Sequence, residues 1–329
     1  MKKILLLLLF TYPLSATKAM IVAACEKYMH MLPTSLEVIR NVHNCQLPIQ
    51  VWYSGGELSQ FSKEKLSLYA PIEFCDITKE YQGSEKEYQG YQIKGLMLAK
   101  TRFDEVLLFD ADVFFHQNPE IVFSFREYQE TGAYVFHDRV HPDFFYYAET
   151  KGVFRYLQRR DFFLNLIKEP SEFVPPTWRH YWDLEFLPKK QNPVNSEHME
   201  SGFMAIDKKR HKKGIEFIEK LNLNFRVSYA YVLGDKETYW LGFEMAHEPY
   251  YVNREFPKIL LGDDDEVGTV QFVNEKLFYQ QKAPIPLGEA PYFRNTEDYS
   301  KMRKLNEEER SLLSQLYFIH QCVLQEFTQ

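Results

Sequence analysis

The sequence predicts an α/β fold with a mostly parallel central sheet and a helix at the C-terminus. In residues 1–115, short apolar runs alternate with segments whose apolar residues recur every three or four positions. This alternation is typical of β–α–β units, whose parallel strands are covered by helices on both faces. The chain has 329 residues, of which 45% are hydrophobic, and no internal repeat or long linker divides it. It is therefore expected to build one large core.

Each element of the first half follows from its local pattern. Continuous apolar runs predict buried strands at 20–24, 47–53, 72–75 and 106–109. Helical spacing predicts helices around 34–42, at 59–68 and at 91–101. Thr34 and Glu37 fit a capping box for the first of these helices, although Pro33 makes its first residue ambiguous.

The second half is less regular. Residues 131–195 are dense in aromatic residues, proline and charge, and are predicted to form loops with short helices. A strand is predicted at 203–206, followed by a helix at 208–221 that Asp207 would cap. Asp235 would cap another helix, and Asn306 with Glu309 fits a capping box for a last amphipathic helix, expected to pack on the domain.

The N-terminus has the layout of a secretory signal peptide. Lys2 and Lys3 precede a short apolar run at 4–10, which ends in small residues at 14–16. We therefore expect residues 1–18 to target the chain for export or to the membrane, with a buried first strand as the alternative. Residues 19–300 are then expected to form the main domain, and residues 301–329 the C-terminal helix.

Composition and missing motifs exclude several classes of function. The 39 basic and 46 acidic residues give a net charge of −7, which argues against sequence-independent nucleic-acid binding. The four cysteines form no C-x-x-C pair, so a zinc ribbon lacks support; buried free thiols are expected, with one disulfide as the alternative if the chain is exported. G-x-S-x-G, H-E-x-x-H, P-loop and G-x-G-x-x-G patterns are all absent, which leaves hydrolase, zincin, NTPase and dinucleotide-binding functions without support.

An acidic pair stands at the end of the strand at 106–109. Asp110 and Asp112 are separated by Ala111. In open α/β sheets ligands bind beyond the carboxyl ends of the strands, and two neighbouring carboxylates there are costly without a cation. Mg²⁺ and Mn²⁺ accept one or two carboxylates and complete their shell with phosphate oxygens. The pair therefore predicts a metal–diphosphate site, with a solvated acidic turn as the alternative because D-x-D often arises by chance.

Further segments carry a resemblance to a known family. They are Tyr91-Gln-Ile-Lys-Gly-Leu-Met-Leu-Ala-Lys100, Phe103-Asp-Glu-Val-Leu-Leu-Phe-Asp-Ala-Asp112, Asn118-Pro119-Glu120, Glu200-Ser-Gly-Phe-Met-Ala-Ile-Asp207 and Gly234-Asp-Lys-Glu-Thr-Tyr-Trp240. In this order and spacing, the chain resembles the fungal-type α-mannosyltransferases (α-1,2/α-1,3 type), which belong to the metal-dependent retaining glycosyltransferases of GT-A fold. The resemblance covers roughly residues 20–280.

The resemblance implies roles for particular residues. Asp110 and Asp112 would hold Mn²⁺ or Mg²⁺, and Glu200 and Asp235 would be the catalytic carboxylates. The implied donor-binding residues are Ile21, Val22 and Ala23 beside the base, Lys94 facing the phosphates, Asp110, Ala111 and Asp112, Ser201 and Gly202 under the sugar, and Lys236 and Glu237 near the acceptor. From the residues alone, Lys94 is equally readable as a surface lysine, Glu200 as a strand-end cap and Asp235 as a helix cap only.

The implied reaction transfers a hexose to a hydroxyl group of a glycan or glycoprotein, with retention of configuration. The implied donor is GDP-mannose, and the implied location is the Golgi or endoplasmic reticulum in a eukaryote and the envelope or exterior in a bacterium. Related enzymes carry a late histidine as third metal ligand, and the segment 268–288 has none. A UDP-sugar donor and a non-catalytic glycan-binding module stay open. A nucleotidyltransferase would be expected to have a Gly-rich loop after the first strand, where this chain has Ala23-Ala-Cys-Glu26.

Overall fold

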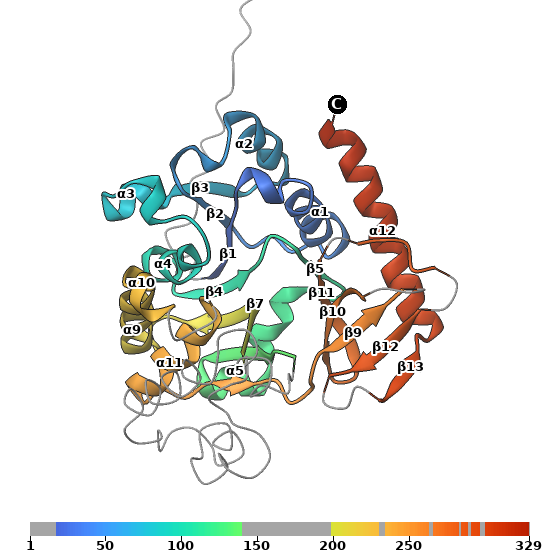
Figure 1. Cartoon of the computed structure of the whole chain (residues 1–329). Coiled ribbons are helices and arrows are strands. Elements are labelled where there is room, and N and C mark those ends of the chain that lie inside the picture. Colours follow the sequence, from blue (N-terminus) through green and yellow to red (C-terminus); the bar gives the residue numbers. More distant parts are fainter. Residues whose placement is uncertain are drawn as a thin grey trace, which may run out of the picture.

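The computed structural model describes residues 18–139, 199–229, 234–262, 266–282, 284–288, 291–296 and 300–328 (Figure 1). The predicted signal peptide lies outside the described residues, apart from Lys18, and so does most of the aromatic-rich segment at 131–195.

The central sheet has seven strands in the order β3-β2-β1-β4-β7-β6-β8. Their bounds are β1 Lys18–Ala23, β2 Ile49–Tyr53, β3 Ile72–Asp76, β4 Glu105–Phe109, β6 Ala133–His137, β7 Met199–Asp207 and β8 Tyr251–Val252. β1 runs parallel to β2 and β4, β2 to β3, and β6 to β8, while β7 is antiparallel to both of its neighbours. The predicted α/β fold with a mostly parallel central sheet is confirmed.

Helices cover both faces of this sheet, as Figure 1 shows. The described helices are α1 Leu32–Glu37, α2 Gln60–Leu66, α3 Ile77–Tyr81, α4 Gln92–Lys100, α5 Arg126–Thr131, α9 Lys212–Leu223, α10 Phe225–Ser228, α11 Lys236–Ala246 and α12 Glu307–Thr328, of which α12 lies beside the second sheet. Short 3-10 or π turns occur at Glu26–Tyr28, Val38–Val42, Gly55–Glu57, Ser67–Tyr69, Glu85–Glu87 and Pro119–Ser124. Helices α4, α9 and α11 pack together and share a hydrophobic cluster with one face of the sheet.

The continuous apolar runs reflect burial on both faces. In β4, Leu107 and Phe109 belong to the cluster that includes α1, whereas Val106 and Leu108 belong to the cluster under α4 and α11. All four side chains are fully buried. Successive strand residues point to opposite faces, so a strand that lies between two helical layers needs apolar residues at every position.

A second sheet has six antiparallel strands in the order β13-β12-β9-β10-β11-β5. Their bounds are β5 Val113–Phe115, β9 Lys258–Leu261, β10 Glu266–Val273, β11 Lys276–Gln281, β12 Tyr292–Asn295 and β13 Met302–Lys304. The sequence analysis did not predict this sheet. Because β5 follows β4 after three residues, the chain passes from the first sheet to the second through Asp110, Ala111 and Asp112.

Several local predictions are wrong. The first helix begins at Leu32, and the Thr34 hydroxyl forms no capping box but hydrogen-bonds His320 Nδ1 of α12 at 2.8 Å. Residues 133–137 form strand β6 instead of a loop. Asp207 does not cap a helix, because its carboxylate accepts the backbone N–H of Lys209 at 3.0 Å in a turn, and α9 starts only at Lys212.

The capping box predicted for the C-terminal helix is confirmed, although α12 starts only at Glu307 and Met302–Lys304, expected to be part of the helix, form β13. The Asn306 side chain accepts the Glu309 N–H at 2.8 Å, and the Glu309 carboxylate accepts the Asn306 N–H at 2.8 Å, which completes the capping box. Leu313, Leu316 and Val323 are buried against the rest of the protein. Among the described helices, α12 included, none combines the length and apolar character that a membrane span needs.

Candidate active site

A pocket of about 500 Å³ opens beyond the carboxyl ends of β1 and β4. Its wall is formed by Ala23, Ala24, Cys25, Lys27, Tyr28, Glu57, Gly90, Tyr91, Ile93, Lys94, Asp110, Ala111 and Asp112. Since β1 and β4 are parallel neighbours, their ends meet at one edge of the sheet, where α/β folds bind ligands. The volume is in the range of cofactor and small-molecule sites.

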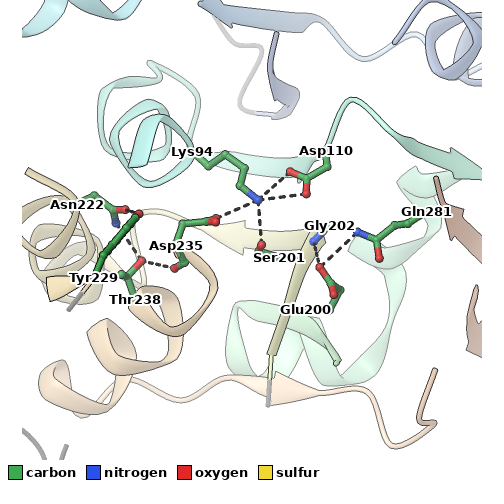
Figure 2. A network of polar contacts seen from close by, with 10 residues as sticks. All are labelled: Lys94, Asp110, Glu200, Ser201, Gly202, Asn222, Tyr229, Asp235, Thr238 and Gln281. Carbon is green, nitrogen blue, oxygen red and sulfur yellow. Dashed lines mark hydrogen bonds and ion pairs between the residues drawn. The ribbon is translucent and has the colours of Figure 1, made fainter. Parts of the chain in front are cut away.

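Lys94 of α4 is the centre of the polar contacts at this edge (Figure 2). Its ammonium nitrogen lies 2.9 Å from Asp110 Oδ1, 3.1 Å from Asp110 Oδ2 and 3.0 Å from Asp235 Oδ2. It also lies 2.9 Å from the Ser201 hydroxyl. The alternative of a surface lysine is therefore wrong, because one buried cation joins residues from three separate motifs.

Electrostatics explains why this lysine remains charged. Burial lowers the pKa of Lys94, but the carboxylates of Asp110 and Asp235 outweigh that effect and raise it above the ordinary value. The side chain is 8% exposed, so each contact acts in a medium of lower dielectric than water. Lys94 is thus a permanent positive charge at the base of the pocket.

In the D-x-D carboxylates, by contrast, the surroundings favour the neutral form over the charged one. Burial, together with the charges of Asp112 and Asp235, raises the pKa of Asp110 to about 6, although Lys94 opposes the shift. Burial also raises the pKa of Asp112, which lines the pocket. A divalent cation would relieve this excess of negative charge, and carboxylate oxygens are the ligands that Mg²⁺ and Mn²⁺ prefer. The residues present therefore fit such a metal.

The described part of the chain offers few ligands to such a metal. Within the residues that the structure describes, no group of three or more His, Cys, Asp or Glu side chains could hold a metal ion. A cation at Asp110 and Asp112 would accordingly complete its shell with phosphate oxygens or water, which is the usual arrangement for Mg²⁺.

The Glu200-Ser201-Gly202 motif lies on β7 and connects three strands. Glu200 Oε1 accepts the Gly202 N–H at 2.9 Å and lies 3.4 Å from Gln281 Nε2 of β11. The Gly202 carbonyl accepts the Asp110 N–H at 2.8 Å, next to the end of β4. A Cβ atom at Gly202 would lie 2.2 Å from Gln281 Nε2, so glycine is what allows Gln281 to reach Glu200.

Asp235 precedes α11 but does not cap it with its side chain. The carboxylate instead points to Lys94, so the alternative of a helix cap only is wrong. The next residue, Lys236, pairs with the carboxylate of Asp138 at the end of β6. Glu237 is buried in the first turn of α11.

The structure does not bring all predicted residues to the pocket. Ile21 and Val22 are fully buried in the two hydrophobic clusters on opposite faces of β1. Of that predicted trio only Ala23 lines the pocket, followed by Ala24 and Cys25. Asp110, Ala111, Asp112 and Lys94 all line it. Ser201 is held against Lys94.

Asp138 was missed by the sequence analysis. It directly follows the apolar strand β6, the same order of strand and acid that drew attention to Asp110, so that signal was available. The Asp138 carboxyl is buried, and burial, with the nearby charge of Glu200, raises its pKa against the effect of Lys236.

Tyr279 of β11 was also missed. Its ring is packed among phenylalanines, and its hydroxyl has no hydrogen-bond partner within the described residues. Burial raises its pKa, and so do the charges of Glu200 and Asp110 nearby. The hydroxyl group therefore lies near the acidic residues of the site, and the sequence, in which Tyr279 belongs to an unassigned segment, offered no signal for it.

The geometry defines a class of protein. A crystal structure of core-mannan synthase A (CmsA/Ktr4) from Aspergillus fumigatus, in its Mn/GDP form, matches with a TM-score of 0.50 and 13% identity over 73% of each chain. At this identity the likeness concerns the fold alone, which is that of the GT-A glycosyltransferases.

The family follows from the sequence comparisons. A family model described as "Mannosyltransferase putative" matches residues 19–277, and the chain belongs to that family. It is 28% identical over 213 residues to "Putative alpha-1,3-mannosyltransferase MNN15" of Candida albicans, covering 62% of this chain and 25% of that protein. It is 25% identical over 252 residues to "Alpha-1,3-mannosyltransferase MNT2" of Saccharomyces cerevisiae, covering 71% and 43%. The chain thus spans a quarter to less than half of these relatives.

Proposed function

We propose that this protein transfers a mannosyl residue from GDP-mannose to a hydroxyl group of a glycan, with retention of configuration and with Mn²⁺ or Mg²⁺ bound by Asp110 and Asp112. The observation that carries the proposal is the cluster of Lys94, Asp110 and Asp112 at the pocket beyond β1 and β4. The ammonium of Lys94 is a fixed positive charge, and the two carboxylates beside it can recruit a divalent cation. Together these two positive charges would stabilise a diphosphate leaving group. Membership of a mannosyltransferase family supports the choice of sugar.

In this proposal the side chains have separate tasks. Lys94 would stabilise the negative charge that develops on the diphosphate, because its ammonium is already desolvated and oriented. The metal, when bound, would supply further positive charge to the same oxygens. Asp235 would keep Lys94 in place, since its carboxylate is 4% exposed and 3.0 Å from the ammonium.

Glu200 is the carboxylate we place beside the reacting carbon. It is more exposed than Asp235 and takes part in no ion pair within the described residues, and a backbone N–H orients it. Retention needs either a carboxylate nucleophile or attack from the face of the departing phosphate. Glu200 is suited to the first route, and in the second it would stabilise positive charge on the sugar ring.

The relatives guide the proposals on linkage and location. Because those reported above carry the name alpha-1,3-mannosyltransferase, an α-1,3 linkage is the first to test. The acceptor would be a glycan or glycoprotein, and the N-terminal segment supports a location in the secretory pathway.

The test is release of GDP or UDP from a panel of nucleotide sugars with Mn²⁺, comparing the wild type with Asp112→Asn. Asp104→Asn is the matched control, because Asp104 pairs with Lys209 away from the pocket. We expect release from GDP-mannose that is lost in Asp112→Asn and kept in Asp104→Asn.

Other outcomes would change the proposal. Release only from a UDP-sugar would retain the metal site and overturn the donor. Binding of glycans without turnover of any donor would overturn the enzymatic proposal in favour of a glycan-binding module.

A further inference from the structure

Behind Asp235 lies a row of buried and half-buried polar side chains that takes no direct part in the proposed chemistry (Figure 2). The Tyr229 hydroxyl donates to Asn222 Oδ1 at 2.6 Å, and Asn222 Nδ2 donates to the Thr238 hydroxyl at 2.9 Å. The Thr238 hydroxyl in turn donates to the Asp235 carbonyl oxygen at 2.5 Å. The row therefore ends on the backbone of the residue that holds Lys94.

We propose that Asn222, Thr238 and Tyr229 are positioning residues, which set the place of Asp235 relative to Lys94. The kinetic consequences of this proposal rest on the proposed function. Its structural claim does not depend on which sugar donor the protein uses.

The polar groups of Asn222 and Thr238 all have hydrogen-bond partners, although both residues lie where an unpaired polar group would be costly. Asn222 and Thr238 are completely buried. Asn222 Nδ2 also donates to the Ile218 carbonyl oxygen at 2.8 Å, so both of its N–H groups and its oxygen have partners. A buried amide with all partners in place permits one arrangement of the surrounding helices, whereas an apolar residue would tolerate several.

Asn222 also contacts α4, the helix that carries Lys94. A Cβ atom at Gly95 would lie 2.2 Å from Asn222 Nδ2 and 2.7 Å from its Cγ. The backbone of α4 therefore rests against the same amide that connects to Thr238 of α11. One side chain on α9 therefore contacts both the helix that carries Lys94 and the helix that Asp235 precedes.

Thr238 fixes the backbone of Asp235. Its side chain does not cap α11, so the start of the helix lacks the usual bond from an N-cap carboxylate. The Thr238 hydroxyl and the Thr238 N–H, at 2.5 and 2.8 Å, both bind the Asp235 carbonyl oxygen instead. This leaves the Asp235 carboxylate free to bind Lys94 while its backbone stays fixed.

The test begins with Thr238→Val, which keeps the shape and removes the hydroxyl, and Thr238→Ser, which restores it. Thr296→Val is the matched control, because Thr296 is 1% exposed and its hydroxyl donates to the Pro257 carbonyl oxygen at 2.6 Å, outside the site. With GDP-mannose and Mn²⁺, and per folded molecule, Thr238→Val should lower kcat about tenfold with little change in donor KM. Thr238→Ser and Thr296→Val should stay near the wild type.

A double-mutant cycle separates positioning from general destabilisation. If Thr238 acts through Asp235, Thr238→Val should cause no further loss of kcat in the Asp235→Asn background. Additive losses, or an unchanged kcat in Thr238→Val, would overturn the proposal. Should Thr238→Val fail to fold, Tyr229→Phe removes the far end of the row, and its loss of kcat should likewise vanish in Asp235→Asn.

A crystal structure of Thr238→Val decides the structural claim even if the wild type turns over no donor. The proposal predicts that the separation of Lys94 Nζ and Asp235 Oδ2 increases from 3.0 Å. An unchanged separation would contradict it, whatever the activity of the wild type. Failure of the proposed function would show instead as an inactive wild type with any of the sugar donors.

Discussion

At the scale of the single residue, the charge of Lys94 is the feature on which most of the site depends. Replacing it by methionine would leave the buried Asp235 and the half-buried Asp110 without their cation. We expect Lys94→Met to lower the free energy of unfolding by about 3–5 kcal/mol, the usual cost of breaking a buried ion pair. Denaturant unfolding checks this.

The control for Lys94→Met is Lys209→Met, whose ammonium is 2.7 Å from Asp104 but whose side chain is 73% exposed. Surface ion pairs contribute little, so its unfolding midpoint should not move. Equal effects in the two variants would contradict the central role of Lys94.

A second residue-scale prediction concerns acid stability. Burial lowers the pKa of His116 to about 4, despite its contact with Gln280. The unfolded chain would bind a proton near pH 6.5 while the folded protein would not, so the stabilisation is present above that pH and is lost toward pH 4. Unfolding free energies measured between pH 7 and 4 should therefore fall less steeply in His116→Gln. Parallel pH profiles would refute the assignment.

At the scale of the element, two glycines mark close approaches with different consequences. A Cβ atom at Gly202 would meet the end of the flexible Gln281 side chain, which can move. A Cβ atom at Gly95 would meet Asn222, which is buried and fully bonded. We expect Gly95→Ala to destabilise the protein by about 1–3 kcal/mol, typical of overpacking. Gly202→Ala should cost less, and thermal melts of both variants compare them. A larger cost for Gly202→Ala would contradict the role given to Asn222.

The strands differ in how clearly their sequences predict them. Strands β1, β2 and β4 were predictable because most of their residues are apolar and are buried on both faces of the sheet. Strands β9 to β13 were not predicted, because they are held by antiparallel pairing with one another and, at β11, with distant β5. The D-x-D motif was recognisable because it directly follows the apolar run of β4.

Other parts of the site depend on tertiary contacts. The sequence around Asp235 has the pattern of a helix cap, and only the approach of α4 shows that its carboxylate binds Lys94. The pairing of Asp138 with Lys236 joins residues far apart in the chain, and the row through Asn222 joins the separate helices α9 and α11. No local pattern indicates such partners.

At the scale of the whole molecule, the D-x-D segment joins the two sheets, and Gln281 of the second sheet reaches Glu200 of the first. A ligand bound at the pocket would therefore contact the segment that connects both sheets. We expect GDP with Mn²⁺ to raise the melting temperature, because ligands that bind only the folded state stabilise it. Asp112→Asn should abolish that rise, whereas the same rise in the variant would place the ligand elsewhere.

The most direct test of the central claim is calorimetric titration of GDP into the protein, with Mn²⁺ and with a chelator. We predict that GDP binds with Mn²⁺, that the chelator and Asp112→Asn strongly weaken this binding, and that Asp104→Asn leaves it unchanged. Equal GDP binding with and without metal, in the wild type and in Asp112→Asn alike, would contradict a metal–diphosphate site at Asp110 and Asp112.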